Sequence, residues 1–133
     1  MRRINEIVLH CADTKITQNF SINDVRRWHV DERGWSDVGY HYYIRLNGNI
    51  ERGRPVEKSG AHAKGHNANS IGICFEGGKL SNSDKWITPL LPQLIGYKKL
   101  EDYLKAVYGD LKVSAHYEYS SKTCPNFDID ILK

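Results

Sequence analysis

The chain has 133 residues, of which 40% are hydrophobic and 26% are charged. This composition fits one globular domain with a sizeable core and leaves no surplus for a second, so we expect a single domain over residues 1–133. The net charge of +3 is much smaller than that of a chain with a dense Lys/Arg stripe, so nucleic acid is not the expected partner. Binding to an extended anionic polymer remains possible.

The first residues exclude the usual export and membrane signals. Only the apolar run 7–9 precedes His10, whereas a signal peptide needs about 7–15 apolar residues and a membrane span about 20. We therefore expect synthesis in the cytoplasm without a membrane anchor. The three cysteines, Cys11, Cys74 and Cys124, are odd in number and scattered, unlike the framework of a disulfide-stapled secreted domain.

In chain order, the first predicted element is a strand. The run EIVLHC at 6–11 is short, β-branched and apolar, which predicts a buried strand whose end delivers His10 into a polar loop. A helix follows from Ser21 to Gly34. Ser21 suits the N-cap, Asp24 the N3 position of a capping box, and Gly34 the C-terminal end.

The middle of the chain predicts a hairpin and a second buried strand. At 41–53, apolar and polar positions alternate around Asn47-Gly48, which is a type I′ turn signal. After a loop rich in Gly, Ala, His and Asn, the run at 70–78 predicts a buried strand that Gly77 and Gly78 end.

A long amphipathic helix is predicted from Thr88 to Gly109, with Pro89 and Pro92 both in its first turn. The run 111–119 then resembles a last strand that carries His116. The order strand, helix, hairpin, strand, helix, strand predicts an α/β fold with a central mixed β-sheet flanked by helices.

Three residues suggest a metal site. His10 and His116 lie at the ends of predicted strands, so adjacent strands can bring them together, and Cys124 lies in the loop that follows. Two imidazoles and a thiolate suit Zn²⁺, and three protein ligands leave a fourth tetrahedral position open. No local H-E-x-x-H or C-x-x-C fixes this site, so packed or hydrogen-bonded roles remain an alternative. That alternative fits Cys11 and Cys74 best.

Four segments carry a resemblance to a known family. They are VLHCADT at 8–14, WSDVGYHYYIRLNGNIERGR at 35–54, GAHAKGHNANSIGICFEGG at 60–78 and SAHYEYSSKTCPNFD at 114–128. Their order and spacing resemble the phage T7 lysozyme-like N-acetylmuramoyl-L-alanine amidases, a zinc amidase family that includes the peptidoglycan-recognition proteins. The resemblance runs from residue 6 to about 129 and is weakest across 79–112.

The resemblance implies roles for individual residues. His10, His116 and Cys124 match the zinc ligands of the family, and members that bind peptidoglycan without cleaving it typically replace this cysteine. Tyr40 and Lys122 match the catalytic tyrosine and lysine. Without the resemblance, Tyr40 would be typical of a half-buried strand and Lys122 of a solvated surface charge.

The loop at 60–70 matches the family as well. His62 falls on a position beside the zinc, so we expect it to contact substrate. His66 and Asn67 are candidates for binding the glycan or the stem peptide, with Asn69 beside them. The alternative for these residues is that they satisfy the backbone of the turn. His29 and His41 are expected to pack.

The family implies a peptidoglycan hydrolase with one Zn²⁺ ion. It would cut the amide between N-acetylmuramic acid and L-alanine, as a monomeric phage or prophage endolysin that reaches the wall after another protein opens the membrane. A non-catalytic recognition module is the rival. Inhibition of RNA polymerase, known for some phage amidases of this kind, relies partly on an N-terminal extension, and only nine residues precede His10.

Overall fold

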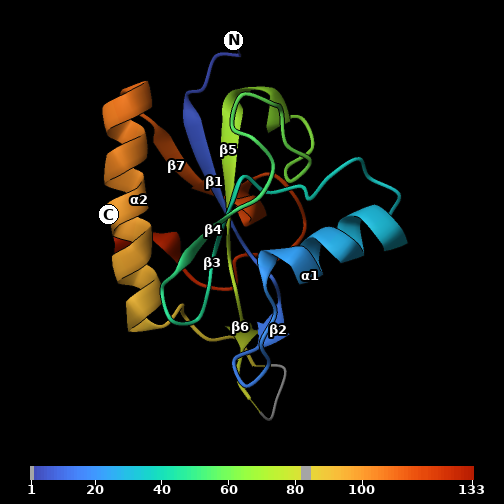
Figure 1. The fold of residues 1–133 in the computed structure, drawn as a ribbon. Coiled ribbons are helices and arrows are strands. Elements are labelled where there is room, and N and C mark those ends of the chain that lie inside the picture. The colour runs from blue at the N-terminus through green and yellow to red at the C-terminus, as the bar shows by residue number, and fades with distance from the viewer. Residues whose placement is uncertain (1, 82–84) are drawn as a thin grey trace.

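The computed structural model describes residues 2–81 and 85–133, and it contains a five-stranded mixed sheet between two helices (Figure 1). The strands follow the order β4 (Ile50–Arg52), β3 (Tyr42–Ile44), β5 (Ser70–Phe75), β1 (Glu6–Cys11) and β7 (Lys112–Ala115). Neighbouring strands are parallel except in the β3–β4 hairpin. The predicted α/β fold class is therefore confirmed.

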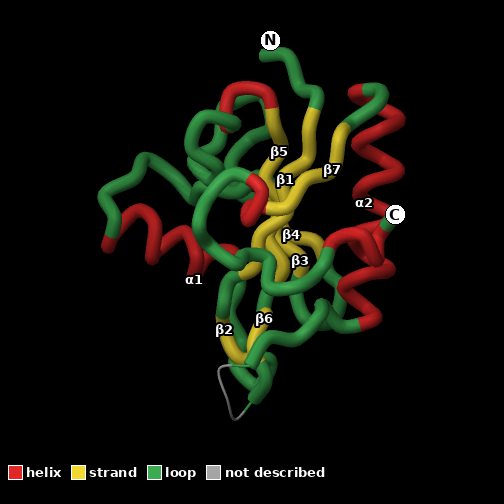
Figure 2. Tube along the Cα trace, turned by 180° about the vertical axis from the view of Figure 1, so that it is seen from behind, coloured by secondary structure: helices red, strands yellow, loops and turns green. Residues whose placement is uncertain are grey.

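The two short strands β2 (Thr14–Lys15) and β6 (Gly78–Lys79) form a separate parallel pair. Figure 2 shows this pair beyond one end of the central sheet. Among the described residues, no helix combines the length and the hydrophobicity that crossing a membrane would require.

The central strands β1 and β5 are buried along their whole length, as strands covered on both faces must be. Successive side chains alternate between the faces. Ile7 and Leu9 enter the larger core cluster with Leu100 and Leu104 of the long helix α2 (Leu91–Tyr108). His10 therefore points to the opposite face, the side of the first helix, where its partner in the register is Cys74.

The first helix, α1 (Ile22–Arg27), begins as the sequence predicts. Ser21 and Asp24 form both halves of a capping box. The helix continues in a π-helical turn, Trp28–Glu32, and Gly34 leaves it with a φ of +71°. This helix covers the sheet face that His10 shares, through Ile22 and Val25.

The second helix, α2 (Leu91–Tyr108), begins later than predicted. Pro92 lies in its first turn, but Pro89 precedes it. The extended Leu90 is the N-cap, because its N–H donates to Oε1 of Gln93 over 2.9 Å. Nε2 of the buried Gln93 donates to the backbone oxygens of Ile44 and Glu76, at 3.2 and 2.8 Å. This side chain therefore fixes the start of α2 against the sheet.

The hairpin turn differs from the predicted type I′. That type needs positive φ at both central residues, whereas Gly48 has a φ of +92° and Asn47 is not among the described residues with positive φ. The bonds from Gly48 N to Arg45 O and from Arg45 N to Asn49 O, both 2.8 Å, form a longer loop. The first turn of α2 passes so closely that a Cβ on Gly48 would lie 2.5 Å from the oxygen of Pro92.

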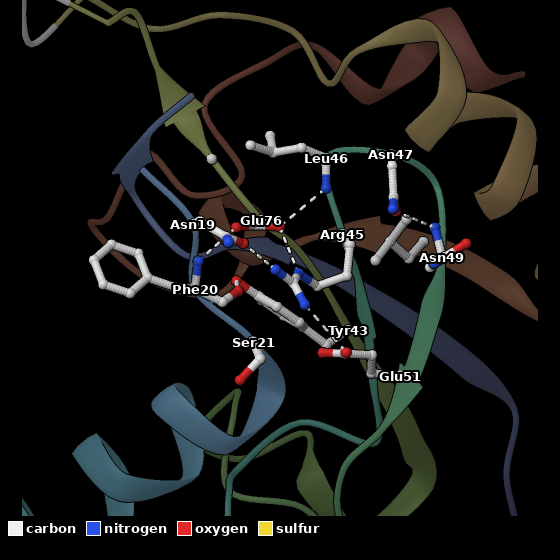
Figure 3. Close-up of polar contacts among 12 residues, drawn as sticks. Asn19, Phe20, Ser21, Tyr43, Arg45, Leu46, Asn47, Asn49, Glu51 and Glu76 are labelled. Atoms are coloured by element: carbon white, nitrogen blue, oxygen red, sulfur yellow. Dashed lines mark hydrogen bonds and ion pairs between the residues drawn. The ribbon is translucent and has the colours of Figure 1, made fainter. Parts of the chain in front are cut away.

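A buried carboxylate ties the loop before α1 to the sheet. Figure 3 shows Glu76, which follows β5, among the groups that it binds. Its oxygens accept from Arg45 Nε at 2.8 Å, Leu46 N at 3.0 Å and Phe20 N at 2.8 Å. Arg45 also reaches Glu51 at 3.2 Å. Because Glu76 is almost fully buried, these bonds are well shielded from water and hold α1 in place over the sheet.

The C-terminal region departs from the predicted strand at 111–119. The strand β7 ends at Ala115, and His116 opens a 3₁₀ turn, His116–Glu118. A second 3₁₀ turn, Ile129–Leu132, follows. All three cysteines are free thiols.

Candidate metal centre and active site

The structure brings together the three residues predicted as metal ligands. One donor atom from each of His10, His116 and Cys124 lies within 4.8 Å of the others. His10 comes from β1, whereas His116 and Cys124 come from the turn after β7 and the loop beyond it. The parallel pairing of β1 with β7 places Leu9 opposite Ala115, so the residues that follow each of them emerge at the same edge of the sheet.

The loop that carries Cys124 is held by the backbone. The N–H of Tyr117 donates to the oxygen of Cys124 over 2.9 Å, and the N–H of Cys11 donates to the sulfur of Cys124 over 3.1 Å. The pKa of the Cys124 thiol is lowered by hydrogen bonding from Cys11 and then from His10 and His116, while that of Cys11 is raised. Of these two thiols, Cys124 is thus the one that loses its proton more readily, and the thiolate is the form that binds metals.

The two histidine rings of the cluster are in contact, with centroids 4.6 Å apart and ring planes tilted by 53°. His10 is 1% exposed, and desolvation lowers its pKa. A buried neutral imidazole offers one nitrogen lone pair, the form that a metal ligand needs. His116 is only partly buried and lies nearer the surface.

The cluster lies at the wall of a groove with a volume of about 1030 Å³, which Tyr40 and Lys122 also line. The ring of Tyr40 lies 5.0 Å from that of His10, between centroids. Burial raises the pKa of the Tyr40 hydroxyl well above its usual value, so this group stays protonated at neutral pH. Lys122 is exposed. The groove is large enough for an extended ligand.

The residues predicted to bind substrate lie in three different settings. His62 is buried behind His10, with its Nδ1 2.9 Å from Nε2 of His10. Asn67 lines the groove, but its side-chain oxygen accepts from the N–H groups of His62 and Ala63, both at 2.9 Å. His66 stacks on Tyr119, with centroids 3.5 Å apart. Contact between substrate and these three residues stays a prediction.

Sequence reasoning missed several residues of the groove wall. They are Arg33, Trp35, Lys64 and Tyr119. Arg33 and Trp35 pair, with the guanidinium carbon 5.2 Å from the ring centroid. The sequence signal for this pair is Trp35, a large aromatic residue that follows Gly34 outside any apolar periodicity. Arg33, Lys64 and Lys122 give this part of the groove wall positive charge, which favours an anionic ligand.

A comparison with protein families decides the identity of this site. The family model described as N-acetylmuramoyl-L-alanine amidase matches residues 1–127. The chain belongs to the N-acetylmuramoyl-L-alanine amidase family. The resemblance inferred from the four sequence segments is confirmed.

Curated relatives of this amidase include phage proteins. The endolysin of Escherichia phage T7 is 41% identical over 124 residues, covering 92% of this chain and 81% of the relative. The endolysin of Klebsiella phage KP32 is 38% identical over 127 residues, covering 94% and 82%.

Solved structures agree with this assignment. The N-acetylmuramoyl-L-alanine amidase LysC from Clostridium intestinale URNW superposes with a TM-score of 0.87 at 32% identity, covering 99% of this amidase and 84% of LysC. The bumblebee peptidoglycan-recognition protein SA has a TM-score of 0.81 at 24% identity, covering 94% and 77%, and it shares the fold.

Proposed function

We propose that the chain is a zinc-dependent peptidoglycan hydrolase of the endolysin type, which cleaves the amide between N-acetylmuramic acid and L-alanine. The convergence of His10, His116 and Cys124 within 4.8 Å at the wall of the groove carries this proposal. The endolysin relatives support the substrate class. They also support action on the cell wall, after another protein has opened the membrane.

The donor set fits zinc. One thiolate and two imidazoles are the borderline-soft ligands that zinc prefers, and three of them leave a position open. His10, His116 and Cys124 would hold the ion. When bound, zinc supplies Lewis-acid chemistry, polarising a carbonyl and lowering the pKa of water to about 7. Side chains of the protein would supply the other positive charge near the carbonyl oxygen and the proton transfers.

In this proposal Lys122 stabilises negative charge. Attack on an amide moves charge onto the carbonyl oxygen, and an ammonium group facing that oxygen stabilises it most in the transition state. Lys122 lines the groove two residues before Cys124. This proximity keeps its backbone close to the metal ligands, while its exposed side chain can turn to the substrate.

In this proposal Tyr40 acts as a hydrogen-bond and proton donor. Its hydroxyl is protonated at neutral pH, and burial raises its pKa further, so it can donate a hydrogen bond to the tetrahedral centre and assist proton transfer to the departing amine. An amide nitrogen is a poor leaving group unless it is protonated. Lys122 would therefore act on the carbonyl oxygen of the scissile amide, and Tyr40 on its nitrogen.

The proposal is tested by digesting purified peptidoglycan with the wild type and with Cys124→Ser. We expect the wild type to release new L-alanine amino termini, and Cys124→Ser to lose both this activity and stoichiometric zinc. Cys74→Ala is the matched control for zinc content, because it removes a buried thiol that is no ligand candidate; its hydrogen bond with Tyr40 makes it unsuitable as a control for activity. Equal release by the wild type and Cys124→Ser would reject the proposal. A wild type that binds muropeptides but never cleaves them would favour a recognition module.

A further inference from the structure

A chain of hydrogen bonds runs from His10 into the interior. Nε2 of His10 lies 2.9 Å from Nδ1 of His62. Nε2 of His62 lies 3.2 Å from Oγ of Ser70, and that hydroxyl donates to the backbone oxygen of His66 over 2.7 Å. The side chains of His10, His62 and Ser70 are all buried, so the protein rather than water sets the position of each proton.

The direction of every bond in this chain follows from its last member. A carbonyl oxygen only accepts, so the single proton of Ser70 must point to His66. The Ser70 oxygen therefore accepts from His62, which places a proton on Nε2 of His62. In a neutral imidazole the other nitrogen is then an acceptor. Nδ1 of His62 must accept, and Nε2 of His10 must carry the proton that it receives.

The ring of His62 is also fixed in space by two glycines. A Cβ on Gly72 would lie 2.6 Å from Cγ and Cδ2 of His62, and a Cβ on Gly60 would lie 2.7 Å from Cδ2. The imidazole thus packs directly against backbone where no side chain intervenes. Both ring nitrogens of His62 are thus bonded within the protein.

We propose that His62 and Ser70 are positioning residues, which hold His10 in the Nε2–H tautomer and so present its Nδ1 as the metal-binding atom. This role rests on the metal function proposed above for His10. A ligand histidine whose second nitrogen has a fixed partner is oriented before the metal arrives. The protein would therefore fix the orientation of His10 before the ion binds.

The direct test is nitrogen-15 NMR of the imidazoles in the metal-free wild type, which requires no substitution. We expect both His10 and His62 as Nε2–H tautomers. A proton on Nδ1 of His10, or an average of both tautomers, would overturn the inference even if zinc binds normally. No zinc binding by the wild type would instead overturn the proposed function on which the role depends.

Zinc affinity, measured by competition with a chelator, gives a second readout. Loss of such a partner typically weakens metal binding on the order of 10–100-fold. We expect that loss in His62→Leu, and substantial recovery in His62→Asn, because its amide oxygen replaces the acceptor Nδ1. His41→Leu is the control, since His41 is a buried neighbour that bonds to Gly72 N rather than to His10. Wild-type affinity in His62→Leu would overturn the inference.

Discussion

The ring of Tyr40 lies between those of His10 and His29, with centroid distances of 5.0 and 5.5 Å. Nδ1 of His29 accepts from the N–H of Gly39 over 2.9 Å, which fixes the backbone immediately before Tyr40. One neighbour of Tyr40 is thus a metal-ligand candidate and the other belongs to the helical turn after α1. The ring of Tyr40 is therefore held by a neighbour from the sheet and a neighbour from this helical turn.

Tyr40→Phe keeps the ring and removes the hydroxyl. If that hydroxyl serves as a proton donor, kcat should fall by roughly 10²-fold, the lower part of the range for general acid–base groups. Zinc content and the midpoint of thermal unfolding should stay near wild type, because the ring packing is retained. Turnover of a muropeptide and metal analysis measure both. Wild-type kcat in Tyr40→Phe would assign the residue to packing alone.

Lys122→Met removes the ammonium and keeps most of the aliphatic stem. We expect kcat to fall by about 10²–10³, which is typical for loss of one group that stabilises an oxyanion. Zinc affinity should not fall, since the removed charge repels the metal. Lys99→Met on the exposed face of α2 is the matched control and should leave kcat unchanged. An unchanged kcat in Lys122→Met would contradict the assignment.

Zinc should stabilise the folded protein as well as activate it. A ligand that binds only the folded state adds about 2.7 kcal/mol when its free concentration is one hundred times Kd. We therefore expect added zinc to raise the midpoint of thermal unfolding of the metal-free wild type. Cys124→Ser should show a much smaller rise. Identical shifts in the two proteins would place the metal elsewhere.

Glu76→Gln tests the buried carboxylate that ties β5 to the loop before α1. Arg45, Leu46 and Phe20 all donate to it, and breaking a buried ion pair costs about 3–5 kcal/mol. We expect a loss near the lower end, because Arg45 keeps Glu51 as a partner. Urea unfolding measures this loss, with the exposed Glu57→Gln as control. Equal stability of both variants would show that the cluster contributes little.

The sequence pattern correctly predicted those elements that are determined by neighbouring residues in the chain. The buried strands 6–11 and 70–75 follow from short apolar runs, and the start of α1 follows from the side chains of Ser21 and Asp24. The turn at Asn47-Gly48 was mispredicted, because the same residues also suit a longer hairpin loop in which only the glycine has positive φ. The close approach of α2 to Gly48 could not be read from the local sequence either.

In the candidate site, too, some features were predicted from the sequence and others were not. The resemblance named His10, His116 and Cys124, and the structure places them together. It could not tell that His62 turns its ring toward Ser70, because a histidine in a polar loop gives no sign of its orientation. The pairing of Arg33 with Trp35 was equally hidden, since only the folded loop brings them to the groove.

The hydrogen bond from Cys11 to Cys124 joins positions that are 113 residues apart. Contacts of such separation close the largest loops in the chain and carry the greatest entropic cost of formation. Metal binding that depends on this contact is coupled to the folding of nearly the whole domain. A chain cut before Cys124 is thus expected to lose one candidate metal ligand and this long-range contact at the same time.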